Sequence, residues 1–151
     1  MTYGSLQRGR RQSAQSYASI GLETKVLSAS PERLITLLFD GARAAIMKAK
    51  LHLENNDIQG RGEAISKAID IVDSGLKLSV NQEAGGEVAT NLITTYELII
   101  RNLLLANLNA DMEKLELAER MLTDIAEAWR LAVDPPNDLR SSQERGTAIT
   151  Y

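Results

Sequence analysis

Four long segments of the chain repeat apolar residues every three or four positions, which is the spacing of one face of an α-helix. They cover about residues 30–54, 58–80, 87–107 and 110–133, and no segment shows the alternation of a half-buried strand. At about 1.5 Å per residue, each helix would be about 30–35 Å long. Loops of roughly 2–8 residues make consecutive helices antiparallel neighbours. The sequence therefore predicts an all-α fold, an antiparallel up-down-up-down four-helix bundle.

The ends of these segments carry start and stop signals. Ser30 is a favoured N-cap residue, and Pro31 suits the first helical position. The runs "NNDIQG" and "NQEAGG" separate the first three helices, and "DPPND" ends the fourth because two prolines cannot continue a helix. The main apolar row of the third helix is Val88, Leu92, Tyr96, Ile99, Leu103 and Ala106, and that of the fourth is Leu115, Ala118, Leu122, Ile125, Trp129 and Ala132. We expect both rows to face the core.

The chain is long enough for one domain with a core and too short for two ordinary ones, at 151 residues. Residues 1–16 are polar and carry Arg8, Arg10 and Arg11 without an acid, so we expect a flexible Arg-rich N-terminal tail. Residues 17–133 are expected to form the bundle, with 17–29 as an N-terminal cap segment that is too short to fold alone. Residues 134–151 are expected to be a flexible C-terminal tail.

Charge and composition exclude several classes of function. The net charge is −3 and the Arg-rich head carries +3, so the rest of the chain carries −6, which disfavours a nucleic-acid partner. The absence of Cys fits a reducing compartment. The polar N-terminus argues against a secretory signal, and no apolar run approaches the ~20 residues of a membrane span. We therefore expect a protein without membrane insertion.

Residues that could carry catalysis or hold a metal are few. His52 is the single histidine, and the Glu-x-x-His pairs of di-iron bundles are missing because Ala49 stands three residues before it. We expect no metal, no cofactor and no enzymatic activity. One alternative is a phosphotransfer bundle that uses His52, since Lys48 and Lys50 lie nearby; the other reading is a histidine at the rim of the first helix.

The second and third helices carry a second apolar row in addition to the one each needs for the core. These extra rows are Ala64, Ile71, Gly75 and Leu78 in the second helix and Ala89, Ile93, Ile100 and Leu104 in the third. One reading is a central, well-covered helix pair. The other is an apolar groove open to a helix of a partner, since monomers seldom expose a large apolar patch without something binding there.

The first helix contains a run of small residues, Gly41, Ala42, Ala44 and Ala45. Gly41 alone costs about 1 kcal/mol of helix stability against Ala, which a good N-cap offsets. Small side chains let another backbone approach closely. That backbone belongs either to neighbouring helices of the bundle or to a partner, and the sequence leaves both open.

The run "SASPERLITLLFDGA" resembles the signature of the flagellin export chaperones, the FliS family, which typically reads Thr/Ser-Ala-Ser-Pro-x-x-Leu-Ile/Val-x-x-Leu-Tyr-Asp-Gly-Ala. The matching motif residues are Ser30, Pro31, Leu34, Phe39, Asp40 and Gly41. "KAIDIV", "GGEVATNL", "LLLANLNAD" and "EAW" also resemble family landmarks, in family order. One departure is Phe39, where the family usually has Tyr, so any hydrogen bond made by that hydroxyl is in doubt.

The resemblance implies a cytoplasmic four-helix bundle without enzymatic activity. It implies that the chain binds the disordered C-terminal segment of flagellin, prevents premature polymerisation and presents flagellin to the gate of the flagellar type III export apparatus. It also implies a self-cap, in which an N-terminal stretch covers a groove until the client displaces it. We assign the self-cap to Tyr17, Ile20 and Leu22, and the client-binding groove to the two extra apolar rows. A structural bundle whose extra rows form a homo-oligomer interface is a further alternative, and a weak homodimer through an empty groove is compatible with the chaperone function.

Overall fold

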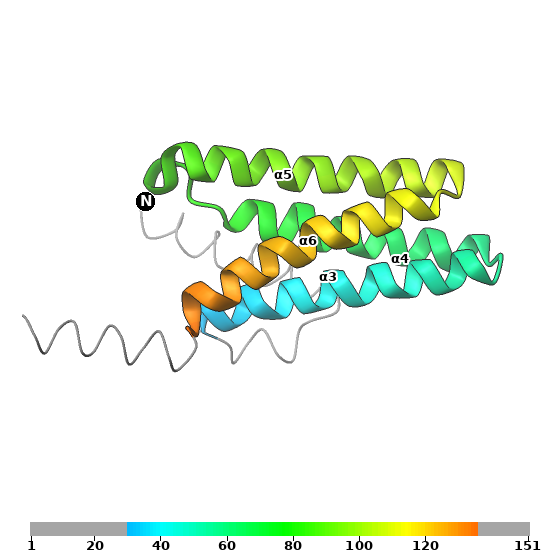
Figure 1. Ribbon diagram of the computed structural model, residues 1–151, viewed down its shortest axis with the longest axis horizontal. Coiled ribbons are helices and arrows are strands. Elements are labelled where there is room, and N and C mark those ends of the chain that lie inside the picture. Colours follow the sequence, from blue (N-terminus) through cyan, green and yellow to red (C-terminus); the bar gives the residue numbers. More distant parts are fainter. Residues whose placement is uncertain (1–29, 136–151) are drawn as a thin grey trace, which may run out of the picture.

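The structure is a computed structural model that describes residues 30–135. Its elements are α3 (Pro31–Glu54), α4 (Ile58–Asp70), the π-helical η1 (Ile71–Leu76), the 3₁₀-helical η2 (Lys77–Ser79), α5 (Gln82–Asn109) and α6 (Met112–Val133). The long helices run lengthwise in alternating directions, and α6 crosses the others obliquely (Figure 1). The predicted all-α, antiparallel four-helix bundle is confirmed, and residues 30–135 contain no strand. The predicted tails and cap segment lie outside this part of the chain, apart from Asp134 and Pro135.

The start of α3 follows the expected capping chemistry. The hydroxyl of Ser30 accepts a hydrogen bond from the backbone N–H of Arg33 at 3.2 Å, and Pro31 occupies the first turn. Because the first four N–H groups of a helix have no partner within it, this bond stabilises the start of α3 by about 1 kcal/mol.

The second predicted helix ends at Ser79, one residue earlier than expected, and is not regular. The α-helical geometry of α4 changes at Ile71 into a π-helical turn and then into a short 3₁₀ turn. Gly75 lies in the π-helical turn, where a Cβ would stand 2.9 Å from Cδ2 of the buried Leu38. The absence of a side chain at Gly75 therefore allows η1 to approach α3 closely without displacing Leu38.

The third predicted helix begins five residues earlier than expected and contains a break. The side chain of Asn81 caps its first turn by accepting a hydrogen bond from the N–H of Ala84 at 3.2 Å. Gly86 then adopts φ 55° and ψ −128°, which redirects the chain before the remainder of α5. Only glycine visits this region without steric cost, which explains the second glycine of "NQEAGG".

The core is aliphatic and draws on every long helix. Its largest fully buried side chains are Leu38, Ile46, Ile65, Ile71, Val72, Leu76, Ile99, Leu103, Leu115 and Leu122. Ala42 and Ala45 of the small-residue run are also buried in the core, whereas Ala44 is exposed. Within the bundle, small residues on α3 therefore serve close packing against its own neighbours.

Candidate functional site

An apolar groove of about 740 Å³ lies at the end of the bundle where α3 and α5 begin and α6 ends. Its lining comes from α3 (Ile35 and Phe39), the end of the second helical segment (Leu76, Ser79, Val80 and Asn81), α5 (Gly85, Val88, Ala89, Asn91, Leu92, Thr95 and Tyr96) and α6 (Asp124, Ile125, Ala128, Trp129 and Ala132). This volume is typical of sites that bind a ligand or a segment of another chain.

The groove is continuous with the core. In the main row of α5, Ile99 and Leu103 are fully buried, whereas Leu92 is half-buried and Val88 is 76% exposed. In the main row of α6, Leu122 is fully buried, whereas Trp129 is half-buried. At this end of the bundle the residues of both rows are therefore no longer fully covered by neighbouring helices, and their apolar side chains form the walls of the groove.

A short chain of hydrogen bonds fixes the orientation of Trp129. Its indole Nε1–H donates to Oγ1 of Thr36 at 3.1 Å, and that hydroxyl donates to the backbone carbonyl of Glu32 at 3.2 Å. The polar edge of the indole is therefore satisfied by α3, and the ring presents its apolar surface to the groove. An aromatic ring that is held in this way loses little further side-chain entropy when a partner binds.

Tyr96 lies at the floor of the groove, and only 3% of its surface is exposed. Burial raises the pKa of its phenol above the ordinary value, because the low dielectric of the surroundings disfavours the phenolate. Phe39, Leu76 and Ala89 form the rest of the buried floor. The buried floor of the groove is therefore neutral and predominantly apolar, with one phenol, whereas the lining also includes the exposed Asp124.

The sequence-based assignment of the groove corresponds to this surface at one residue, Ala89. The structure places Ala64, Ile71 and Gly75 among the buried residues, Ile93 and Ile100 half-buried, and Leu78 and Leu104 exposed. Ile71 and Gly75 pack into the core, so a partner has no access to them in this conformation. We therefore move the candidate site from the two extra rows to the groove at the end of the bundle.

The residues that line the groove were assigned to the core on periodicity alone. Val88, Leu92 and Tyr96 follow the same spacing as Ile99 and Leu103, so no difference in the pattern separates the groove from the core. The signals available were the glycine pair before Val88 and the single Trp near the end of the last helix, both of which mark the same end of the bundle.

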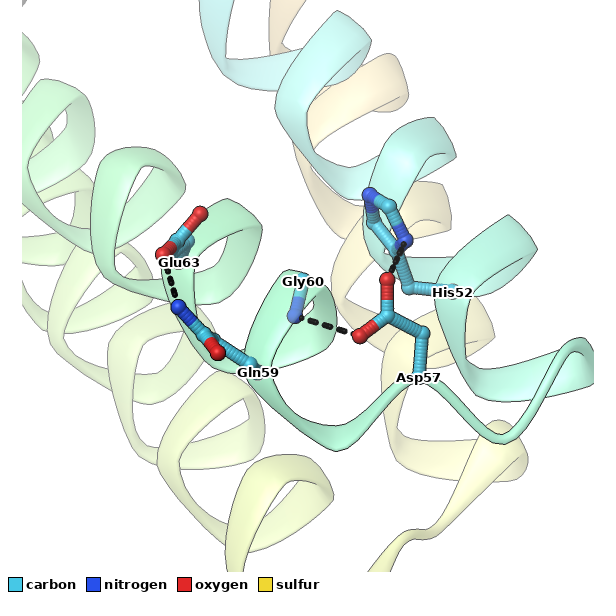
Figure 2. A network of polar contacts seen from close by, with 5 residues as sticks. All are labelled: His52, Asp57, Gln59, Gly60 and Glu63. Carbon is cyan, nitrogen blue, oxygen red and sulfur yellow. Dashed lines mark hydrogen bonds and ion pairs between the residues drawn. The ribbon is translucent and has the colours of Figure 1, made fainter.

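His52 has a local structural role at the turn between α3 and α4. Figure 2 shows its Nδ1 beside Oδ2 of Asp57, at 3.0 Å, while the other oxygen of Asp57 accepts the N–H of Gly60 at 2.9 Å and caps α4. A Cβ at Gly60 would collide with His52 and Asp57, so the glycine allows this arrangement. Across residues 30–135, no group of three or more His, Cys, Asp or Glu side chains is placed to hold a metal ion.

Sequence comparison adds to this geometry. The family described as "Flagellar protein FliS" matches residues 13–136. The flagellar secretion chaperone FliS of Salmonella typhimurium is 51% identical over 116 residues, which cover 77% of this chain and 86% of that protein. The protein of the same name from Escherichia coli K12 is 42% identical over 123 residues, 82% of this chain and 90% of the relative. This chain belongs to the FliS family. The resemblance carried by the motif of the first helix is thereby confirmed.

The FliS motif occupies the N-terminal part of α3, beside the groove. Ser30 and Pro31 begin the helix, Leu34 is half-buried, Asp40 is exposed and Gly41 is half-buried. Phe39 is buried and lines the groove, so this FliS chain has no hydroxyl at that position. The role of the family is that of a chaperone, which is a non-enzymatic role. Among the described residues, no helix combines the length and the apolarity that a membrane span needs.

Proposed function

We propose that this chain is a cytoplasmic export chaperone for flagellin, and that its groove binds the disordered C-terminal segment of the client. The observation that carries the proposal is an apolar groove of about 740 Å³ in a member of a family of flagellar secretion chaperones. An amphipathic helix laid into an apolar groove is a common way for one protein to hold a segment of another.

The physical logic of such a chaperone suits a groove rather than a catalytic site. A client segment that folds as it binds loses conformational entropy, so its affinity per buried area stays modest and the client can be released for export. While bound, the apolar face that would contact other flagellin subunits is covered, which prevents premature polymerisation. The chaperone then presents the client to the gate of the flagellar type III export apparatus.

We propose in addition that Tyr17, Ile20 and Leu22 form the self-cap. Helix α3 begins at Pro31, and Ile35 and Phe39 of its first turns line the groove. Residue 30 therefore lies at the end of the bundle that carries the groove, which supports a cap formed by residues that precede it in the sequence. In this proposal the cap segment and the client compete for the same apolar surface.

The test is a calorimetric titration of the full chain with a synthetic C-terminal segment of flagellin from the same organism. The expected result is saturable one-to-one binding with a large negative heat-capacity change, which marks burial of apolar surface. The chain contains a single Trp, and it lines the groove, so its fluorescence should change on binding. A peptide of the same composition in scrambled order serves as the control.

Two results would contradict the proposal. One is the absence of any heat or fluorescence change with a folded, monomeric chain. The other is concentration-dependent sedimentation without flagellin binding, which would favour a homo-oligomeric bundle.

A further inference from the structure

The hydroxyl of Tyr96 has no hydrogen-bond partner among residues 30–135, although 97% of the residue is buried (3% exposed). Within that part of the chain, no fully covered side-chain nitrogen or oxygen lacks a partner. The hydroxyl is therefore not fully covered, and Tyr96 is one of the residues that line the groove.

The other polar groups of the groove differ from this hydroxyl. Ser79 donates to the carbonyl of Gly75 at 2.6 Å, and Thr95 donates to that of Asn91 at 2.8 Å. The side chain of Asn81 caps α5, and the indole N–H of Trp129 is bonded to Thr36. Asn91 and Asp124 are exposed at the rim, where water remains available. Among the described lining residues, Tyr96 thus carries the one polar group of the buried floor, and a bound segment that covers this hydroxyl would remove its water without a substitute from residues 30–135.

A wholly apolar segment would be penalised at this point, because a desolvated hydroxyl without a partner costs free energy. The interior backbone groups of a helical segment are already bonded to one another, so the matching group must come from a side chain. A carboxylate is disfavoured, since Asp124 lines the groove and the exposed Glu87 lies next to Val88. A neutral side-chain oxygen fits both conditions.

We propose that the Tyr96 hydroxyl is a specificity-determining contact that donates a hydrogen bond to an Asn, Gln, Ser or Thr side chain on the otherwise apolar face of the bound flagellin helix. The inference rests on the proposed function and names the chemistry of its site. A site built to hydrogen-bond one group discriminates strongly against segments that lack it, whereas apolar contacts alone discriminate weakly between clients of similar shape.

The test compares the full wild-type chain with Tyr96→Phe, which removes the hydroxyl and keeps the ring. We expect the affinity for the C-terminal flagellin segment, measured by calorimetry, to fall about 5- to 150-fold. The urea midpoint of unfolding should not decrease, because the hydroxyl has no partner to lose in the free chain. Thr94→Val is the matched control: it removes one hydroxyl from the exposed side of α5, outside the groove, and should leave the affinity within about twofold.

The outcomes separate this inference from the proposed function. If the wild-type chain binds and Tyr96→Phe binds as tightly or more tightly, the assignment to Tyr96 is overturned and the proposed function stands. If the wild-type chain does not bind the segment, the proposed function fails and the assignment fails with it.

A double-mutant cycle identifies the side chain that accepts the bond. Each Asn, Gln, Ser and Thr of the flagellin segment is replaced by Ala and titrated against the wild-type chain and Tyr96→Phe. One replacement should weaken binding to the wild-type chain and have little effect on binding to Tyr96→Phe. If every replacement weakens both equally, no side chain pairs with Tyr96, and the inference is overturned.

Discussion

Replacing Val88 by Asp should weaken client binding strongly while leaving the bundle folded. Val88 lines the groove from α5 and is 76% exposed, so it contributes little to the stability of the free chain. Substitutions at such exposed positions change the free energy of unfolding by about 0.5 kcal/mol or less. The position therefore separates an effect on binding from an effect on folding.

The size of the effect follows from the surface that Val88 has left to bury. Full burial of a valine side chain contributes about 1.5–3 kcal/mol. With 76% of Val88 still exposed, about three quarters of that, ~1–2 kcal/mol, is available to a partner. Asp loses this contribution and adds the cost of desolvating a carboxylate beside Asp124. We expect the affinity for the flagellin segment to fall by at least about 30-fold.

Leu104→Asp is the matched control on the same helix. Leu104 is 56% exposed, belongs to the extra apolar row of α5 and does not line the groove. Both variants should keep the far-ultraviolet circular dichroism of the wild-type chain, and only Val88→Asp should lose the calorimetric signal. If Leu104→Asp loses binding and Val88→Asp keeps it, the client lies on the extra rows and the groove is the wrong site.

Three further outcomes test the structure and the proposed self-cap. Deletion of residues 1–22 should leave the affinity for the client equal or tighter, because the competing cap is removed, and a large loss in the same titration would make the segment part of the client site. Gly86→Ala should lower the free energy of unfolding, measured in urea, by about 1–3 kcal/mol, because φ is 55° at this position. Gly62→Ala, at a helical position with room for a Cβ, should raise it by about 0.4–1 kcal/mol. Equal effects of the two substitutions would contradict the break at Gly86. Burial raises the pKa of the Tyr96 phenol, so as pH rises above about 10 the phenol loses its proton in the unfolded chain before it does so in the folded chain. The free energy of unfolding should therefore fall there by up to about 1.4 kcal/mol per pH unit. If a Tyr96→Phe chain loses stability equally steeply with pH, this expectation is refuted.

Much of the fold was predictable because local chemistry and helical period agree along the chain. Ser30 and Pro31 begin α3 as their side chains require, and the turn at "NNDIQG" ends it as expected. The break at Gly86 was missed because periodicity describes only which side of a helix is apolar, and a glycine pair is compatible with either a loop or a redirected first turn.

The sequence predicted a partner-binding groove along the two extra apolar rows, whereas the candidate groove in the structure lies at the end of the bundle. The excess of apolar residues on α5 suggested such a surface without giving its position. Ala64, Ile71 and Gly75 have the spacing of a second row, yet all three are buried, and Gly75 approaches Leu38 of α3 closely. Periodicity within one helix does not show how many neighbouring helices cover it.

By itself, the sequence determined the class of the fold, the main helix boundaries and the family, because these depend on patterns within single segments. Only the tertiary structure decided which part of each apolar row is core and which part is groove. Val88 and Ile99 lie on the same row of α5, but one is largely exposed and the other fully buried. The physical reason is that burial depends on whether neighbouring helices cover a position, and at the end of the bundle beside Trp129 they leave it open.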